Sequence, residues 1–442
     1  MMRTANISRI LLAGTLLLAL GCKKKDDATP PAPPTGGGGG GGSSCEAQWL
    51  PVVMCHGALA SGDTWAGQAK RMVQNGYCTD RIFVHDRNTV GGSGHVALLD
   101  AFIDQVLAQT GAAQVELVGH SAGGGLGYDY LADAGRAAKV AHYVHIGSSA
   151  AAGPAGPGGN VPTLNIWSPD DAIASGGNIN GAVNVQLPGQ DHYQVATSAE
   201  AFAAMFAFFR GQAPATTDLV ADGARTVAGR AVTFGENEPI SGAPVLVFKT
   251  DPATGMRLSN EPAHSFTTST TGHWGPFSAE ANTWYEFEIT PPGGRRIHYY
   301  REPFIASDRL VYLRTMPPPT SLAGILLSSL PTDDAQGVLT VFTASQAVEA
   351  GRDDLTANGT YLATPTFAPA SNCTIAWFLY DANNNGQSEG TAAGLFGSFP
   401  FLSGVDLFFV PGGAAEVTLN GRTMRARNWP SASEGITVLV FD

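Results

Sequence analysis

Charged residues are scarce in this 442-residue sequence, and basic residues are scarcer than acidic ones. Lysine and arginine together number 25 against 37 aspartates and glutamates, which leaves a formal net charge of −12 at pH 7. Proteins bind nucleic acid through a basic face, so this composition argues against a nucleic-acid partner. It also argues against tight electrostatic binding to anionic lipid.

The N-terminal region lacks an apolar run long enough to stay in a membrane as a helix. Its mostly apolar stretch, Ile10–Leu20, follows two arginines and is too short to span a bilayer. Residues 1–22 are therefore predicted to be a bacterial lipoprotein signal peptide, because Leu18-Ala19-Leu20-Gly21-Cys22 resembles a lipobox in which Cys22 carries lipid. We expect a protein that is lipid-anchored to the membrane of the cell envelope and exposed outside the cytoplasm, with plain secretion as the alternative.

Cysteine is rare, with five in the chain. Export implies an oxidising compartment, in which a disulfide can form. Cys45 and Cys78 flank the first predicted strand and the helix that follows it, and they are the expected pair. Cys55, at the end of that strand, is expected to be a small buried apolar residue.

Glycine is abundant, at 55 residues, and its distribution helps to divide the chain. Residues 23–44 contain lysines, prolines and seven consecutive glycines, and are predicted to be a flexible tether. Residues 45–212 alternate short apolar runs with helical stretches, which predicts an α/β domain with a small, doubly wound, mostly parallel sheet. The expected strands are Pro51–Met54, Arg81–Val84, Val115–Val118, Val140–Ile146, Thr163–Trp167 and Val183–Leu187. The expected helices are Thr64–Asn75, Val96–Gln109, Ala122–Ala134 and Ala199–Phe209.

The sequence pattern of the remainder of the chain is typical of a β-sandwich or β-barrel. Short strand-like runs are separated by Gly, Pro, Asn and Asp turns, and apart from the neighbourhood of residues 333–349 no helix is predicted in this part of the chain. Two β domains are expected, 217–316 and 320–442, joined near Pro317–Pro319, with the second a candidate lipid-binding domain. The expected strands include Pro244–Lys249, Trp284–Ile289, Leu310–Arg314, Val338–Phe342, Thr374–Tyr380, Leu407–Val410 and Ile436–Phe441.

One motif in the predicted α/β domain indicates a catalytic residue. Gly119-His120-Ser121-Ala122-Gly123 matches G-x-S-x-G, follows a predicted strand and leads into a predicted helix. A sharp strand-to-helix turn of this kind holds the serine in a strained backbone and lifts its hydroxyl clear of the sheet. Ser121 is therefore the predicted nucleophile.

A serine hydroxyl needs a neighbouring base, and the base needs a group that orients it. His192, in the loop after the last predicted strand, is the predicted base, whereas His142 and His145 lie within a strand and are expected to be packed there. The acid should follow the preceding strand, where Asp170 and Asp171 stand side by side; Asp171 is preferred on the family resemblance described below. Asp191 is too close to His192 in sequence to be the favoured partner.

An oxyanion formed at Ser121 would need two backbone N–H donors. The amide of Ala122, directly after the nucleophile, is one predicted donor. The other is the amide of Ala58, in the His56-Gly57-Ala58 loop after the first strand. His56 is expected to brace that loop through side-chain hydrogen bonds.

These motifs resemble those of the minimal, lidless bacterial lipases of the Bacillus type, which have the α/β-hydrolase fold. The likeness spans about residues 50–210 and rests on the segments around His56, Ser121, Asp171 and His192, in that order. In that family the catalytic aspartate stands just before a residue and an aliphatic pair, and this aligns with Asp171. Some secreted bacterial lipases also have a cysteine before the first strand and a Gly-Tyr-Cys like the one ending at Cys78.

The whole architecture resembles archaeal-type lipases with a C-terminal β-rich lipid-binding domain. The resemblance implies a carboxylic ester hydrolase, a lipase or esterase, that acts through an acyl-enzyme. A polyester or polyhydroxyalkanoate depolymerase, or a non-catalytic surface binding protein on a hydrolase scaffold, are the alternatives.

No cofactor is predicted, and the sequence leaves the oligomeric state open. Asp381, Asn383 and Asn385 fit the start of an oxygen-ligand calcium loop, but Ala392 at the twelfth position excludes an EF-hand. A polar hairpin turn is the favoured interpretation of this stretch, with calcium as the weaker one.

Overall fold

The computed structural model describes residues 45–442. The predicted signal peptide, the lipidation site at Cys22 and the tether lie outside the described residues. Among the residues described, no helix combines the length and apolar character needed to cross a bilayer.

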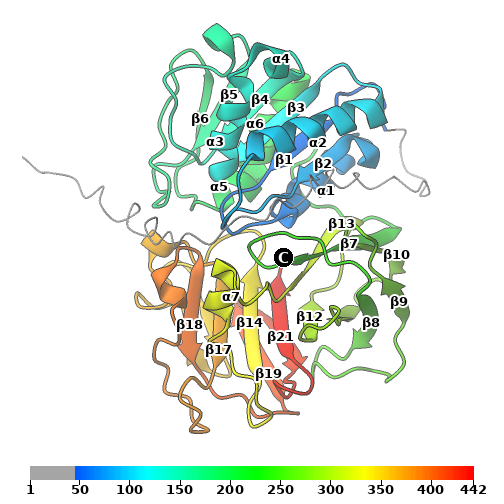
Figure 1. Ribbon diagram of the computed structural model, residues 1–442, viewed down its shortest axis with the longest axis vertical. Helices are drawn as coiled ribbons and strands as arrows, with labels where there is room; N and C mark the ends of the chain where they lie inside the picture. Colours follow the sequence, from blue (N-terminus) through cyan, green and yellow to red (C-terminus); the bar gives the residue numbers. More distant parts are fainter. Residues whose placement is uncertain (1–44) are drawn as a thin grey trace, which may run out of the picture. The chain divides into compact units, whose positions relative to one another are not determined.

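The first part of the described chain is built on a six-stranded parallel sheet, as the alternating sequence pattern predicts (Figure 1). The strand order is β2-β1-β3-β4-β5-β6, with every neighbouring pair parallel. The strands are β1 (Val52–Cys55), β2 (Ile82–His85), β3 (Val115–His120), β4 (Val140–Ile146), β5 (Thr163–Trp167) and β6 (Val183–Gln186). The helices are α1 (Ala66–Gln74), α2 (His95–Thr110), α3 (Ala122–Leu131), α4 (Ala134–Ala137), α5 (Gln194–Thr197) and α6 (Ala199–Arg210).

Helices cover both faces of this sheet because its central strands are apolar on both sides. Along β1, Val53 and Cys55 belong to a core shared with α2 and α3, whereas Val52 and Met54 belong to a core shared with α1 and α6. A disulfide joins Cys45 to Cys78 and so connects the segment before β1 to the segment after α1. Cys55 is a buried free cysteine.

The second part of the described chain is rich in strands, as expected, and forms three sheets. A three-stranded sheet contains β7 (Arg225–Thr233), β10 (His273–Ala279) and β13 (Asp308–Thr315). A four-stranded sheet contains β15 (Leu355–Ala357), β16 (Thr360–Tyr361), β19 (Ala414–Leu419) and β20 (Arg422–Arg427). The remaining strands, β8 (Pro244–Thr250), β9 (His264–Thr267), β11 (Trp284–Ile289), β12 (Ile297–Arg301), β14 (Val338–Thr343), β17 (Ala376–Tyr380), β18 (Leu402–Asp406) and β21 (Ile436–Phe441), form an eight-stranded sheet.

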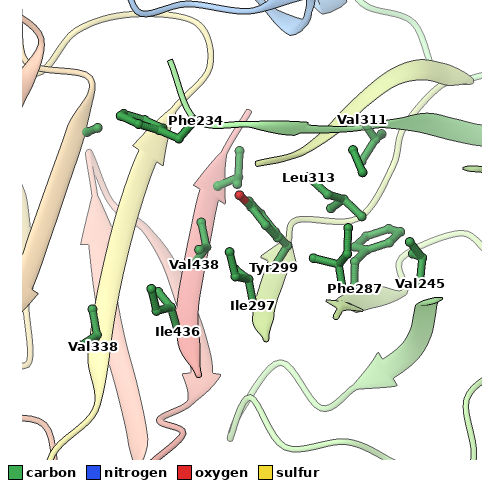
Figure 2. Close-up of a cluster of buried hydrophobic side chains, with 14 of the residues drawn as sticks. Phe234, Val245, Phe287, Ile297, Tyr299, Val311, Leu313, Val338, Ile436 and Val438 are labelled. Carbon is green, nitrogen blue, oxygen red and sulfur yellow. The ribbon is translucent and has the colours of Figure 1, made fainter. Parts of the chain in front are cut away.

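The eight-stranded sheet contributes to a hydrophobic core on each of its faces. On one face, Ile436 and Val438 of β21 pack in the same cluster as Val311 and Leu313 of β13 (Figure 2). The alternate residue Leu439 packs on the other face with the four-stranded sheet. This follows from the period of two along a strand, which sends successive side chains to opposite faces.

The last strand joins the two predicted β domains. β21 is hydrogen-bonded in parallel to β12 on one side and to β14 on the other. Strands from 217–316 and from 320–442 therefore contribute to one continuous sheet, and the segment near Pro317–Pro319 connects elements that share a core.

Two expectations for this β-rich part were wrong. Residues Leu407–Val410 were expected to be a strand, but the strand here is β18, which ends at Asp406. Leu407 still donates to the Tyr380 carbonyl and Phe409 accepts from the Gly337 amide, but the strand pairing ends at Asp406 and Val410 is exposed. A short helix, α7 (Leu322–Leu327), also lies where none was expected, and Ser321 caps its N-terminus.

Candidate active site

Ser121 lies at the junction of β3 and α3, in a backbone conformation that residues other than glycine seldom adopt. Its φ is 52° and its ψ is −120°. Its amide donates to the carbonyl of Ile146 in β4, and its carbonyl accepts from Gly124 in the first turn of α3. The sharp turn predicted from the motif is present, and Ser121 is partly exposed there.

The glycines of the motif are required by close packing. A side chain at Gly119 would clash with the backbone of Gly123, and one at Gly123 would clash with the backbone carbonyls of Cys55 and His56. Helix α3 can therefore approach the end of β1 closely. A Cβ at Gly57 would lie 3.1 Å from the Cβ of Ser121, which places the loop after β1 beside the nucleophile position.

His192 and Asp171 are in contact. His192 Nδ1 lies 2.7 Å from Asp171 Oδ2, and both side chains are buried. Asp171 Oδ1 accepts from the amides of Ile173 and Ala174 at 2.9 Å. Burial alone would raise the pKa of Asp171, but the hydrogen bond from His192 and these amides outweigh it and lower that pKa below its usual value.

The other imidazole nitrogen of His192, Nε2, is buried and has no hydrogen-bond partner in the described part of the chain. This is the atom that would take a proton from Ser121. In catalytic sites, the hydrogen bond between a nucleophile and its base is often long or poorly aligned until substrate binds. His120 also bonds to His192: its Nε2 donates to the His192 carbonyl at 2.8 Å, and burial lowers the pKa of His120 to about 3, so that it is neutral near pH 7.

The other polar residues considered for this site have hydrogen-bond partners of their own. Asp170 Oδ2 accepts the amide of Gly189 at 2.6 Å. His142 bonds to Glu116, and His145 bonds to Asn165, so both histidines of β4 have partners away from Ser121. Asp191 Oδ1 accepts the amides of Tyr193 and Gln194.

The two expected oxyanion donors come from different elements. Ala122 is the first residue of α3, where a backbone N–H has no partner within the helix. Ala58 is partly exposed in the loop after β1. His56 braces that loop: its Nδ1 donates to the Gly57 carbonyl at 2.9 Å, and its Nε2 accepts the Arg87 amide at 3.2 Å.

Sequence reasoning missed one residue that covers this site. Phe401, just before β18, stacks on the ring of His192 with centroids 5.8 Å apart and planes 20° apart. It belongs to a small buried cluster with Tyr193, Ala347 and Cys373. No motif could have identified it, because Phe401 is more than two hundred residues from His192 in sequence.

Two clusters of acidic side chains lie outside this site. Asp381 accepts the amides of Asn385 and Gly386, and Asn383 donates to Asp406, so these polar side chains bond to neighbouring groups of the protein. Glu286, Glu288 and His298 also lie close enough together to share an ion. However, Arg257 donates to both of these glutamates, at 2.5 and 2.7 Å, and supplies the positive charge itself.

Comparison with known proteins identifies three regions of the chain. Residues 51–159 match the model of the alpha/beta hydrolase fold, and residues 223–318 match the lipase C-terminal domain. A third model, which describes another C-terminal domain, matches residues 342–442.

Individual relatives match only part of the chain. A non-heme haloperoxidase of Rhodococcus erythropolis is 38% identical over 104 residues, which make up 22% of this chain and 36% of that protein. Among solved structures, a bromoperoxidase of Bacillus anthracis is 19% identical over 37% of this chain and 93% of its own, with a TM-score of 0.30. A carboxylesterase of Bacillus subtilis is 13% identical over 38% of this chain and 86% of its own, also with a TM-score of 0.30. Likenesses this distant carry no argument about the substrate.

Proposed function

The chain has the α/β-hydrolase fold with a lipase C-terminal domain added to it, and from this premise we propose that it is a serine-dependent carboxylic ester hydrolase. The observation that supports the proposal best is the buried contact between Asp171 and His192, together with the strained turn at Ser121. The matched lipase C-terminal domain favours lipid esters as substrates.

In the proposed reaction, Ser121 Oγ attacks the ester carbonyl carbon while its proton passes to His192 Nε2. Asp171 holds the imidazole in the tautomer with a proton on Nδ1 and stabilises the imidazolium that forms. The amides of Ala58 and Ala122 would donate to the carbonyl oxygen as it becomes negative. His192 then protonates the leaving alcohol, which leaves an acyl group on Ser121. Water, activated by His192, releases the acid.

Replacing the nucleophile tests the proposal. Ser121→Ala should abolish hydrolysis of p-nitrophenyl esters, whereas Ser278→Ala should keep wild-type turnover because Ser278 is an exposed serine on β10. Hydrolysis by Ser121→Ala at the wild-type rate would refute the assignment. A fluorophosphonate probe should add covalently to the wild type and not to Ser121→Ala. A folded wild type that neither takes up the probe nor hydrolyses any ester would favour a binding protein.

The class of ester is tested separately. If the substrate is a lipid ester, kcat/KM should rise from acetyl to octanoyl p-nitrophenyl esters, because a longer acyl chain buries more apolar surface. A preference for acetyl esters would indicate a short-chain esterase. Anchoring through Cys22 stays a prediction that mass analysis of the mature protein can test.

A further inference from the structure

A turn of the lipase C-terminal domain enters the catalytic domain beside the proposed oxyanion site. β7 ends at Thr233, and the turn that follows is held within its own domain by hydrogen bonds from Phe234 to Thr315 and from Asn237 to Thr233. Asn237 sits in this turn with a φ of 60°, and its side chain is buried. These backbone hydrogen bonds fix the turn and with it the position of the Asn237 side chain.

The side chain of Asn237 connects two loops of the catalytic domain. Its Nδ2 donates to the carbonyl of Ala60, in the loop after β1, and to the carbonyl of Arg87, in the loop after β2, each at 2.9 Å. Its Oδ1 accepts the hydroxyl of Ser61 at 2.6 Å. One buried amide thus satisfies three groups of the catalytic domain.

The first of these loops depends on side chains because no strand pairing holds it. His56–Ser61 follows β1 directly and includes Ala58, the proposed oxyanion donor. The amide of Leu59, which has a φ of 58°, donates to Thr89 Oγ1 at 2.8 Å. A residue with positive φ keeps that conformation only when its surroundings impose it.

His56 and Asn237 act on the same loop. Burial lowers the pKa of His56 to about 4, so its Nε2 stays an acceptor near pH 7. His56 Nε2 accepts a hydrogen bond from the Arg87 amide and lies 3.4 Å from Asn237 Nδ2. Only His56 belongs to a sequence motif, since Asn237 is 181 residues away from it.

We propose that Asn237 is a positioning residue that holds the oxyanion loop, His56–Ser61, in the conformation required for catalysis. This inference rests on the proposed function. Its consequence is that the lipase C-terminal domain contributes to the chemical step. A donor aimed at a developing oxyanion is sensitive to small displacements, since a shift of about 1 Å can lower the rate about a hundredfold.

Asn237→Gly isolates the side chain, because glycine accepts a φ of 60° without strain. We expect kcat for p-nitrophenyl esters to fall by about 10- to 100-fold, which is somewhat less than the loss of a complete oxyanion donor. KM should change little, because the side chain of Asn237 bonds to loops of the protein itself. Asn358→Gly is the matched control: Asn358 has a φ of 45°, and its Oδ1 accepts the Glu416 amide in a turn of the four-stranded sheet. Its kcat should equal that of the wild type.

A second measurement does not depend on activity. The amides of Leu59 and Gly62 are bonded to Thr89 and Asp86, and hydrogen exchange in a peptide covering 55–62 reports on the loop. Exchange should be faster in Asn237→Gly than in the wild type and unchanged in Asn358→Gly.

The outcomes separate this inference from the proposed function. A lower kcat with faster exchange supports the positioning role. Unchanged exchange overturns it whether or not kcat falls, and so does an unchanged kcat with faster exchange. If the wild type hydrolyses no ester, the proposed function fails, and the exchange rates alone decide whether Asn237 holds the loop.

Discussion

Two adjacent carboxylates after β5 have different partners. Asp171 reaches His192 Nδ1, whereas Asp170 turns to the amide of Gly189 in the loop that carries His192. Both therefore act on the same loop, one through the imidazole and one through the backbone. Only Asp171 is placed to stabilise a protonated imidazole.

Substitution at the residue scale should separate these two roles. Asp171→Asn removes the charge and offers an amide where His192 needs an acceptor, so kcat for ester hydrolysis should fall by about 10³- to 10⁴-fold. Asp170→Asn keeps an oxygen for Gly189 and should lower kcat by no more than about threefold, a loss of under 1 kcal/mol. Steady-state kinetics of both variants measure this. Equal losses in the two variants would contradict the assigned roles.

At the scale of elements, the loop bearing His192 is anchored by a segment of the last β region. Asp191, buried beside the base, bonds to Arg352 at 2.9 Å and accepts the amide of Ala347 at 3.2 Å. Thr197, at the end of α5, donates to the carbonyl of Ser345 in the same segment. Together with the stacking of Phe401 on His192, these contacts connect residues 345–401 to the base.

Arg352→Ala should therefore destabilise the fold. Arg352 is 30% exposed but Asp191 is buried, so removing the arginine leaves a buried carboxylate without its cation. This should lower the free energy of unfolding by about 2–4 kcal/mol. Arg425→Ala is the control, because Arg425 pairs with the exposed side chain of Glu416. Losing this surface pair should lower the free energy of unfolding by less than about 1 kcal/mol. Urea unfolding measures both values. Similar costs in the two variants would show that the anchor at Asp191 adds nothing.

At the scale of the whole molecule, buried neutral histidines should make stability depend on pH. Burial lowers the pKa of His56 to about 4 and those of His85 and His120 to about 3. Since an unfolded histidine takes up a proton near pH 6.5, unfolding binds protons below that pH. The stability that these groups contribute is complete above about pH 6.5 and is lost as the pH falls toward the folded values.

Each such histidine should steepen the loss of stability by up to about 1.4 kcal/mol per pH unit. Urea midpoints at pH 7.5, 6 and 5 measure the combined slope. His85→Gln, which cannot be protonated, should reduce the slope, while the other buried histidines continue to contribute to it. A midpoint that does not change between pH 7.5 and 5 would contradict the prediction.

Much of the architecture follows from patterns that are local in the chain. Five of the six strands expected in the α/β domain agree with the observed strands to within a residue at each end. Such bounds can be predicted because apolar runs and the residues that end an element are recognisable within a short stretch of sequence. The errors occur where local signals are weak. β18 contains Ser403 and Gly404 and has little strand character, so the sequence pattern favours a strand in the neighbouring run Leu407–Val410 instead.

By itself, the sequence determined the α/β domain, the β-rich region after it and the turn at Ser121, because these depend on periodicity and on close packing of small residues near in sequence. Only the tertiary structure decided that Asp171 rather than Asp170 contacts His192. It alone placed Phe401 against the imidazole and Asn237 between two catalytic loops, and it merged the two β regions into one sheet. Each of these features is a contact between residues far apart in the chain or a choice between neighbours of equal chemistry, and such contacts form only when the whole chain has packed.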